Sequence, residues 1–223
     1  MFIPLKDLNP SRAYPFINYT LILLNVAAFL YEFNLRLTLT PRAYDAFLFT
    51  YSVVPTRFLG FLDGHTSFEV AFLPLLTSMF LHGGLLHLAG NMLFLWIFGD
   101  NVEDSLGHLP YLFFYLVCGV GAGLLQSFFS LHSNIPALGA SGAISGVMGS
   151  YILLYPRARV LTLIFIFVVP IPAVFVLGLW FVMQFLSGID ALGAGVMGGV
   201  AWWAHIGGFL LGMLLTSLLE RRP

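Results

Sequence analysis

Apolar runs long enough to cross a bilayer recur along this chain, and they constrain its fold more than any other feature. A membrane-spanning helix needs about 20 mostly apolar residues. Composition agrees, because 59% of the 223 residues are hydrophobic and 9% are charged, whereas a soluble domain carries roughly 25% charged residues. We therefore predict an all-α membrane protein, embedded in a lipid bilayer and forming a single domain over residues 1–223.

Six segments qualify as spans, and the positive charges orient them. The segments are 16–33, 81–98, 109–131, 141–155, a fifth within 160–186, and 195–219. Pro170 and Pro172 interrupt the fifth, so its first part either belongs to the span or lies along the membrane surface. With the N-terminus inside, six of the nine Lys and Arg residues are also inside, as is usual for cytoplasmic segments. These six are Lys6, Arg12, Arg157, Arg159, Arg221 and Arg222.

The orientation and the charge balance complete the predicted architecture. We expect a six-helix bundle with both termini inside and with segment 34–80 packed as a long first loop in the outer interface. The formal net charge is −1, so no basic field indicates nucleic-acid binding. A single cysteine, Cys118, excludes a disulfide framework. The N-terminus has no apolar run ahead of a small-residue cleavage site, so the first span is expected to stay as an anchor.

The motif GASGAISG, residues 139–146, opens the fourth span. Ser141 to Tyr155 is 15 residues, about 22 Å of helix, which is less than the roughly 30 Å hydrocarbon core. The preceding loop must therefore dip inward, and such backbone is tolerated only beside a water-filled cavity. This places Ser141 at the floor of a wet pocket, on a helix N-terminus that favours developing negative charge. The alternative is close helix packing through a stripe of Gly142, Gly146 and Gly149, and both interpretations can hold.

The motif AWWAHIGGFLLG, residues 201–212, lies in the sixth span. Ala201, His205, Gly208 and Gly212 fall on one helix face, whose small residues would let it approach the fourth span. His205 lies ten residues past Gly195, about 15 Å down if the helix begins there, which is comparable to the depth of Ser141. A histidine alone could simply join two helices by a hydrogen bond. Together, Ser141 and His205 are candidates for nucleophile and general base.

The motif HGGLLHLAGNM, residues 82–92, opens the second span. His87 and Asn91 are four residues apart and share a helix face, so both could donate hydrogen bonds to an oxyanion beside the Ser141 N–H. His82 points away from His87 on a helix and is interpreted as part of a structural polar network. These side chains and His205 could instead bind a metal. The HExxH pattern is absent, however, and we expect neither a metal nor a cofactor.

GASG, AHIGG and HxxxxHxxxN in this order resemble the rhomboid intramembrane serine proteases, of the compact six-span bacterial type, from about His82 to Gly212. The resemblance implies a Ser141–His205 dyad without a third acid, and an oxyanion hole of His87, Asn91 and Ser141. The supporting residues it implies are His82, Gly139, Gly142 and Gly208. It also implies that Glu103 forms structural hydrogen bonds and that residues 132–140 form a flexible loop over the site.

The same resemblance implies transmembrane-helix substrates, cut near the outer face, and a multi-pass location in a prokaryotic inner membrane. Two features depart from the family pattern. Segment 34–80 has no Trp-Arg pair, and Ser145 stands where some members place an aromatic residue against the histidine, which leaves open what holds His205. The alternatives are a catalytically inactive membrane protein that binds client helices, and a transporter, which the absence of a visible inverted repeat disfavours. The oligomeric state is unknown.

Overall fold

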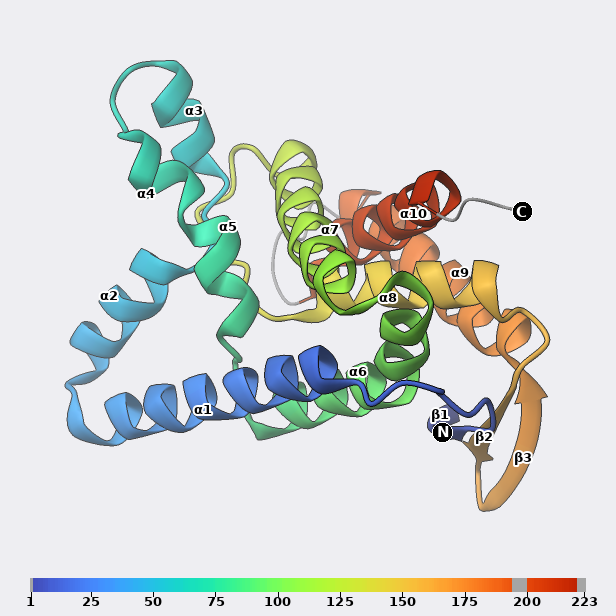
Figure 1. Ribbon diagram of the computed structural model, residues 1–223. Helices are drawn as coiled ribbons and strands as arrows, with labels where there is room; N and C mark the ends of the chain where they lie inside the picture. Colours follow the sequence, from blue (N-terminus) through green and yellow to red (C-terminus); the bar gives the residue numbers. More distant parts are fainter. Residues whose placement is uncertain (1, 194–199, 220–223) are drawn as a thin grey trace.

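The computed structural model describes residues 2–193 and 200–219, and it shows a helical bundle with a small sheet at one end (Figure 1). The elements are β1 (Phe2–Asp7), α1 (Phe16–Thr38), α2 (Pro41–Tyr51), α3 (Thr56–Leu62), α4 (Phe68–Phe72), α5 (Pro74–Thr77), η1 (Ser78–Phe80), α6 (Leu85–Leu106), α7 (His108–Phe129), α8 (Ser141–Leu154), β2 (Arg159–Ile164), β3 (Phe167–Pro172), α9 (Ala173–Gly193) and α10 (Trp202–Leu219).

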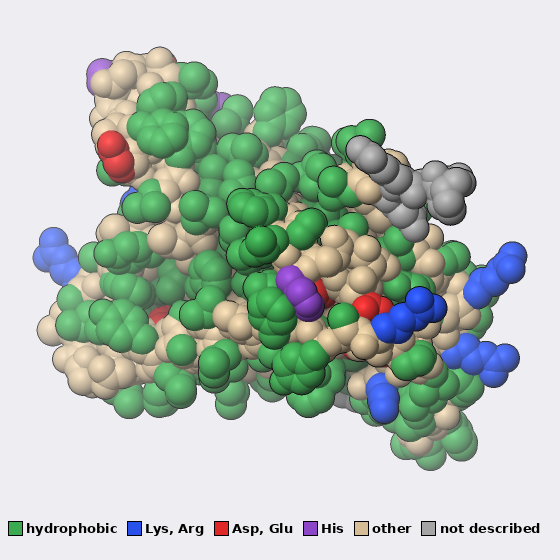
Figure 2. Space-filling view, viewed as in Figure 1, with side chains coloured by type: hydrophobic (Ala, Val, Ile, Leu, Met, Phe, Trp, Pro, Cys, Tyr) green, Lys and Arg blue, Asp and Glu red, His purple; other side chains and the backbone are tan. Residues whose placement is uncertain are grey.

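Five helices in the described part of the chain, α1, α6, α7, α9 and α10, are long and apolar enough to cross a membrane. Large apolar side chains are exposed along all five, and Figure 2 shows a mostly hydrophobic surface over the bundle. Such a surface is unfavourable in water and suits acyl chains. The protein is therefore a multi-pass integral membrane protein.

Helix α8 differs from the others because it is short and enclosed. It has 14 residues, and those from Gly142 to Tyr151 are all buried, with α6, α7 and α10 packed around it. A helix that touches protein on every side does not need the length of a lipid-facing span. Its small residues Gly142, Ala143, Ser145 and Gly146 leave room for these neighbours.

Helices α8 and α10 approach so closely that backbone meets backbone. A Cβ added to Gly208 would lie 1.9 Å from the Gly142 carbonyl oxygen, and one added to Gly212 would lie 2.0 Å from that of Gly146. Real Cβ atoms do not come this close to an oxygen, so both positions require glycine. The prediction that small residues bring the fourth and sixth spans together is confirmed.

The prediction of a helical membrane bundle is confirmed, but the fold is not all-α, because the chain also contains a three-stranded antiparallel sheet in the order β1-β2-β3. The fifth span is predicted within 160–186, with its first part either in the span or along the membrane surface; that first part forms the hairpin β2-β3, and the helix begins only at Ala173. β-branched residues such as Val160, Thr162 and Ile164 favour strand. Pro170 has no N–H for a helix and lies in an edge strand, where this costs least.

Several predicted helix ends also shift. Helix α1 continues to Thr38, and α6 begins at Leu85 rather than residue 81 and runs on to Leu106. The predicted start of the sixth span at 195 lies outside the described residues, as do Arg221 and Arg222. Because Val200 and Ala201 are not helical, the described helix starts at Trp202 and His205 is in its first turn. The depth of His205 therefore cannot be counted along a helix from Gly195.

The long first connection is helical rather than extended. It holds α2, α3, α4, α5 and η1, at the end of the molecule opposite the sheet (Figure 1). Val53, Phe58, Ala71 and Leu75 form a small apolar core of its own. The connection is thus a packed unit beside the bundle.

Candidate active site

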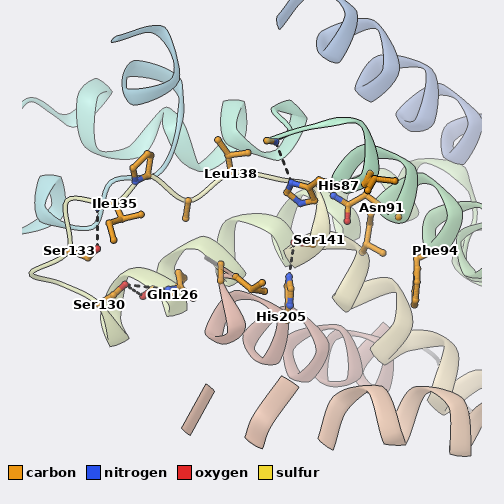
Figure 3. A pocket seen from close by; sticks show the side chains of 18 of the residues that line it. His87, Asn91, Phe94, Gln126, Ser130, Ser133, Ile135, Leu138, Ser141 and His205 are labelled. Carbon is orange, nitrogen blue, oxygen red and sulfur yellow. Dashed lines mark hydrogen bonds between the residues drawn. The ribbon is translucent and has the colours of Figure 1, made fainter. Parts of the chain in front are cut away.

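Ser141 and His205 lie face to face across the contact between α8 and α10. The Ser141 Oγ is 2.8 Å from the His205 Nε2 (Figure 3). Ser141 is the first residue of its helix, and both side chains are partly exposed. Because the glycine contacts fix the spacing of the two helices, they also fix the distance between hydroxyl and imidazole.

The second ring nitrogen of His205 bonds to Gln184 of α9. The Gln184 Oε1 lies 2.7 Å from the His205 Nδ1. An amide oxygen only accepts hydrogen bonds, so Nδ1 carries the proton and Nε2 presents a lone pair to the Ser141 hydroxyl. The Trp180 ring lies beside the same imidazole, tilted by 38° with centroids 5.8 Å apart. These two α9 residues hold the ring, while Ser145 donates instead to the Ser141 carbonyl at 2.6 Å.

His87 and Asn91 of α6 face the same pocket as Ser141 (Figure 3). The His87 Nδ1 accepts a hydrogen bond from the Gly83 N–H at 3.4 Å, which leaves the proton of a neutral ring on Nε2. The buried Asn91 Nδ2 has no hydrogen-bond partner among the described residues. A buried donor without a partner calls for an explanation, and an incoming oxygen would supply one.

Gly139 shapes the wall of the pocket next to His87. Its φ is +124°, in a region that side chains rarely adopt, and a Cβ there would lie 2.8 Å from the His87 Nε2. Its N–H donates to the Ser78 carbonyl at 2.9 Å. Only glycine lets this backbone pass so close to the imidazole, immediately before α8 begins.

His82 precedes α6, so helix geometry does not set its direction. Its ring centroid is 5.1 Å from that of His87, and the expectation that it points elsewhere is wrong. Its backbone N–H donates to the Glu32 Oε2 at 2.9 Å, and Tyr44 donates to the other carboxylate oxygen at 2.9 Å. Glu32 is a buried carboxylate near the end of α1, 2% exposed, and sequence reasoning did not single it out.

Glu103 occupies a structural position at the sheet end of α6. Its carboxylate accepts hydrogen bonds from the backbone N–H groups of Ile17 and Asn18, at 3.1 and 2.7 Å, and it pairs with the His108 ring. It thereby satisfies free N–H groups in the first turn of α1.

A pocket of about 530 Å³ opens beside Ser141 and His205. Its lining includes Phe94, Ile135, Leu138 and Trp180 as well as the polar groups described above. The segment 132–140 borders it and is tied to the first connection, because Val53 and Ala137 exchange backbone hydrogen bonds of 3.0 and 2.8 Å. The pocket is thus large enough for several side chains and is lined mainly by apolar groups.

Sequence reasoning also missed two glutamines that lie in otherwise apolar helices. Gln184 orients His205, and Gln126 of α7 accepts a hydrogen bond from the Ala204 N–H at 3.2 Å, at the start of α10. Polar residues inside membrane segments are rare and mark functional positions. That signal would have found both residues.

These features define a multi-pass membrane protein in which a serine and a histidine on two tightly packed membrane helices form a hydrogen bond beside a mainly apolar pocket. Residues 70–222 match the Rhomboid domain family model. The chain belongs to the rhomboid family, whose members are generally intramembrane serine proteases.

Curated relatives agree with this assignment. The chain is 36% identical over 156 residues to RHOMBOID-like protein 4 of Arabidopsis thaliana, covering 67% of this chain and 34% of that protein. It is 33% identical over 144 residues to the mitochondrial Rhomboid protein 1 of Saccharomyces cerevisiae, covering 61% and 39%. Rhomboid protease GluP of Bacillus subtilis matches at 45% over 76 residues, covering 34% and 14%. The chain therefore spans less than half the length of these relatives.

Proposed function

We propose that this protein is an intramembrane serine endopeptidase that cleaves transmembrane segments of other membrane proteins. The observation that carries the proposal is the 2.8 Å contact between the Ser141 Oγ and the His205 Nε2, with the opposite ring nitrogen held by Gln184. A side-chain hydroxyl bonded to an oriented imidazole is the arrangement that serine nucleophiles use. In addition, the Bacillus subtilis relative is named a protease.

The reaction follows from where the protons lie. The Ser141 Oγ attacks the carbonyl carbon of the scissile peptide bond while its proton passes to the His205 Nε2. The oxyanion of the tetrahedral intermediate accepts hydrogen bonds from the Ser141 N–H, the His87 Nε2–H and the Asn91 Nδ2. His205 then protonates the leaving amine, which breaks the C–N bond and leaves an ester on Ser141. Water, deprotonated by His205, hydrolyses that ester and regenerates the serine.

The proposed topology has six spans, with both termini on the inner side. Five of them are α1, α6, α7, α9 and α10. The remaining span, fourth in chain order, is α8, which at 14 residues is about 21 Å long and so begins well inside the bilayer. The sheet end then faces the cytoplasm, and Ser141 lies in the outer half of the membrane. In this placement water reaches the dyad through the pocket. We place the protein in a prokaryotic inner membrane, as the compact bacterial type.

The proposed substrates are helices that unwind easily. A peptide bond inside a helix is shielded by its own hydrogen-bonded turn, so it must become extended before a serine can attack it. Helix-weakening residues near the cut reduce that cost, by about 1 kcal/mol for each glycine. We therefore propose cleavage near the outer face, at small residues in a destabilised span.

The experiment that tests this proposal is cleavage of a transmembrane substrate by the protein reconstituted in vesicles. Ser141→Ala and His205→Ala are expected to abolish cleavage, while Cys118→Ala, which alters a buried residue outside the site, keeps it. A serine-directed fluorophosphonate is expected to label the wild type at Ser141 and to spare the His205→Ala variant. If the wild type binds substrate helices without cutting or being labelled, it is the inactive binding protein instead.

A further inference from the structure

The turn between β2 and β3 exposes large apolar side chains. Phe165 and Ile166 form the turn and are 77% and 82% exposed, and Phe167 is 67% exposed. Figure 1 shows the hairpin extending sideways from the bundle, across the direction of α8 and α9, and Figure 2 shows hydrophobic atoms where it ends. No described part of the chain covers this tip.

The backbone conformation of the turn indicates that its apolar side chain lies in an apolar environment. Phe165 has a φ of 54° and is the one non-glycine residue with positive φ in the described ranges. Two-residue hairpin turns place Gly, Asn or Asp at such positions, because a bulky side chain there is strained. In water a glycine would remove both the strain and the exposed ring. The phenylalanine is favourable only where the ring is taken out of water.

The outer edge of the hairpin is short of backbone donors. Ile164 pairs with Phe167 across the two-residue turn, and Pro170 and Pro172 pair with Leu161 and Arg159. Hydrogen-bonded and non-hydrogen-bonded pairs alternate along an antiparallel ladder, so both prolines stand where an N–H would face outward. The missing donors lower the cost of contact with an apolar phase. The outward carbonyls still lack partners, so this edge of the hairpin cannot enter the hydrocarbon core itself.

Basic residues surround the base of the same sheet. Lys6, Arg157 and Arg159 are exposed, and Figure 2 shows Lys and Arg side chains gathered at this end of the molecule. The nearby Asp7 is instead buried and accepts hydrogen bonds from Tyr151 and Asn101 at 2.8 and 3.0 Å. The surface charge around the hairpin is therefore positive, which complements anionic lipid headgroups.

We propose that the hairpin 159–172 is a membrane-surface anchor, with its tip inserted at the boundary between headgroups and acyl chains of the leaflet at the sheet end. Its partner is an anionic lipid surface, contacted by Lys6, Arg157 and Arg159. The site is continuous with the lipid-facing surface of the spans, since β3 leads directly into α9, which exposes large apolar side chains. This proposal does not require that the protein is a protease. The proposed orientation decides only whether the contacted leaflet is the inner or the outer one.

The experiment uses spin labels on the full chain in vesicles of phosphatidylcholine and phosphatidylglycerol. In a Cys118→Ala background, which removes the single native cysteine, labels are placed by Ile166→Cys, by Arg157→Cys at the base of the sheet, and by Phe113→Cys on the lipid-facing side of α7. Collisions with oxygen and with a water-soluble nickel complex report depth. We expect nickel accessibility at 166 to be several-fold below that at 157 and above that at 113. Equal nickel accessibility at 166 and 157 would overturn the anchor.

A second comparison tests whether the basic residues and anionic lipid contribute to binding. In phosphatidylcholine alone, or in a Lys6→Gln, Arg157→Gln, Arg159→Gln variant, we expect nickel accessibility at 166 to rise. An unchanged value overturns the role of anionic lipid. If a label disturbs folding, Phe167→Trp replaces it, and quenching by lipids brominated near the headgroup must exceed that of the parent protein. A failure of cleavage with an intact anchor would refute only the proposed function.

Discussion

At the scale of single residues, the state of the imidazole depends on a neutral amide rather than an acid. Gln184 is 8% exposed and accepts a hydrogen bond from the His205 Nδ1–H. A carboxylate in this position would also attract the imidazolium by charge. Gln184 fixes the direction of the ring and its tautomer, and adds only a dipole. We therefore assign it a positioning role.

Gln184→Leu is expected to lower kcat by about 10²-fold, because a mispositioned base loses most of its effect. Gln184→Glu keeps an acceptor at the same place and is expected to restore much of that loss, which a purely structural role for the residue would not explain. The measurements are cleavage rate and fluorophosphonate labelling rate. Met183→Leu, next along α9 and exposed to lipid, is the control and should behave as the wild type.

Asn91 offers a test in which activity and stability separate. Asn91→Ala is expected to reduce kcat by about 10²–10³-fold, the usual cost of one oxyanion donor, with little change in KM. Because the Asn91 Nδ2 has no partner among the described residues, its removal should not lower the thermal unfolding temperature. A variant that loses stability along with activity would contradict the oxyanion role and favour a structural one.

At the scale of elements, the contact between α8 and α10 leaves no room for a side chain. A Cβ on Gly149 would lie 2.1 Å from the backbone oxygen of Phe209. Gly149→Ala is therefore expected to destabilise the protein by about 1–3 kcal/mol, the usual cost of overpacking. Gly178→Ala in α9 is the matched control, since nothing lies within 4 Å of its added Cβ. Thermal unfolding in detergent compares them, and equal unfolding temperatures would disprove the tight contact.

The helices were predictable from sequence, and the sheet was not. Long apolar runs locate α1, α6, α7 and α9 because burial in lipid needs only length and hydropathy, but the ends are less well placed, since α6 continues to Leu106 and α9 begins only at Ala173. The run 160–172 is apolar except for Thr162, so it has no period that separates strand from helix. Its partner β1 lies at Phe2–Asp7, and no local signal connects segments so far apart in the chain. The β-branched content and the prolines were the available indications.

The site was predictable to different degrees for different residues. Ser141, His205, His87 and Asn91 stood out because each is polar within a glycine-rich or apolar motif, and the structure places all four along one pocket. Gln184, Gln126 and Glu32 belong to no motif. Their polar character within apolar helices was the available signal for the two glutamines, and the hydrogen-bond partners show what each residue does. The direction of the His82 side chain depended on where α6 begins, a boundary that sequence patterns set least well.

At the scale of the whole molecule, Asp7 links the first strand to the bundle. Burial raises the pKa of Asp7 from the ordinary 3.8 to about 6. The charge of Asp100 also raises this pKa, whereas the hydrogen bonds to Asp7 and the charge of Lys6 lower it. Since the folded protein holds this proton more tightly than the unfolded chain, Asp7 contributes stability that is full below pH 3.8 and is lost as pH rises through 6. Its carboxylate meets Tyr151 of α8 and Asn101 of α6.

The wild type is therefore expected to lose stability between pH 5 and pH 7 relative to an Asp7→Asn variant, whose side chain does not titrate. Thermal unfolding in detergent across this range measures the difference. Lys6→Gln, on the exposed face of the same strand, is the control and should retain the wild-type pH dependence. Parallel curves for Asp7→Asn and the wild type would show that Asp7 titrates normally.

The hydrogen bond from His205 to Gln184 has a consequence for how a guest helix could be admitted. Serine and histidine sit on α8 and α10, which interlock, but the acceptor for the far side of the imidazole arrives on α9. Any displacement of α9 away from α10 would break the hydrogen bond between Gln184 and His205 and would leave the ring free to turn away from the hydroxyl. The orientation of His205 toward Ser141 thus depends on α9 being packed against α10, and the pair would lose its geometry whenever the two helices separate.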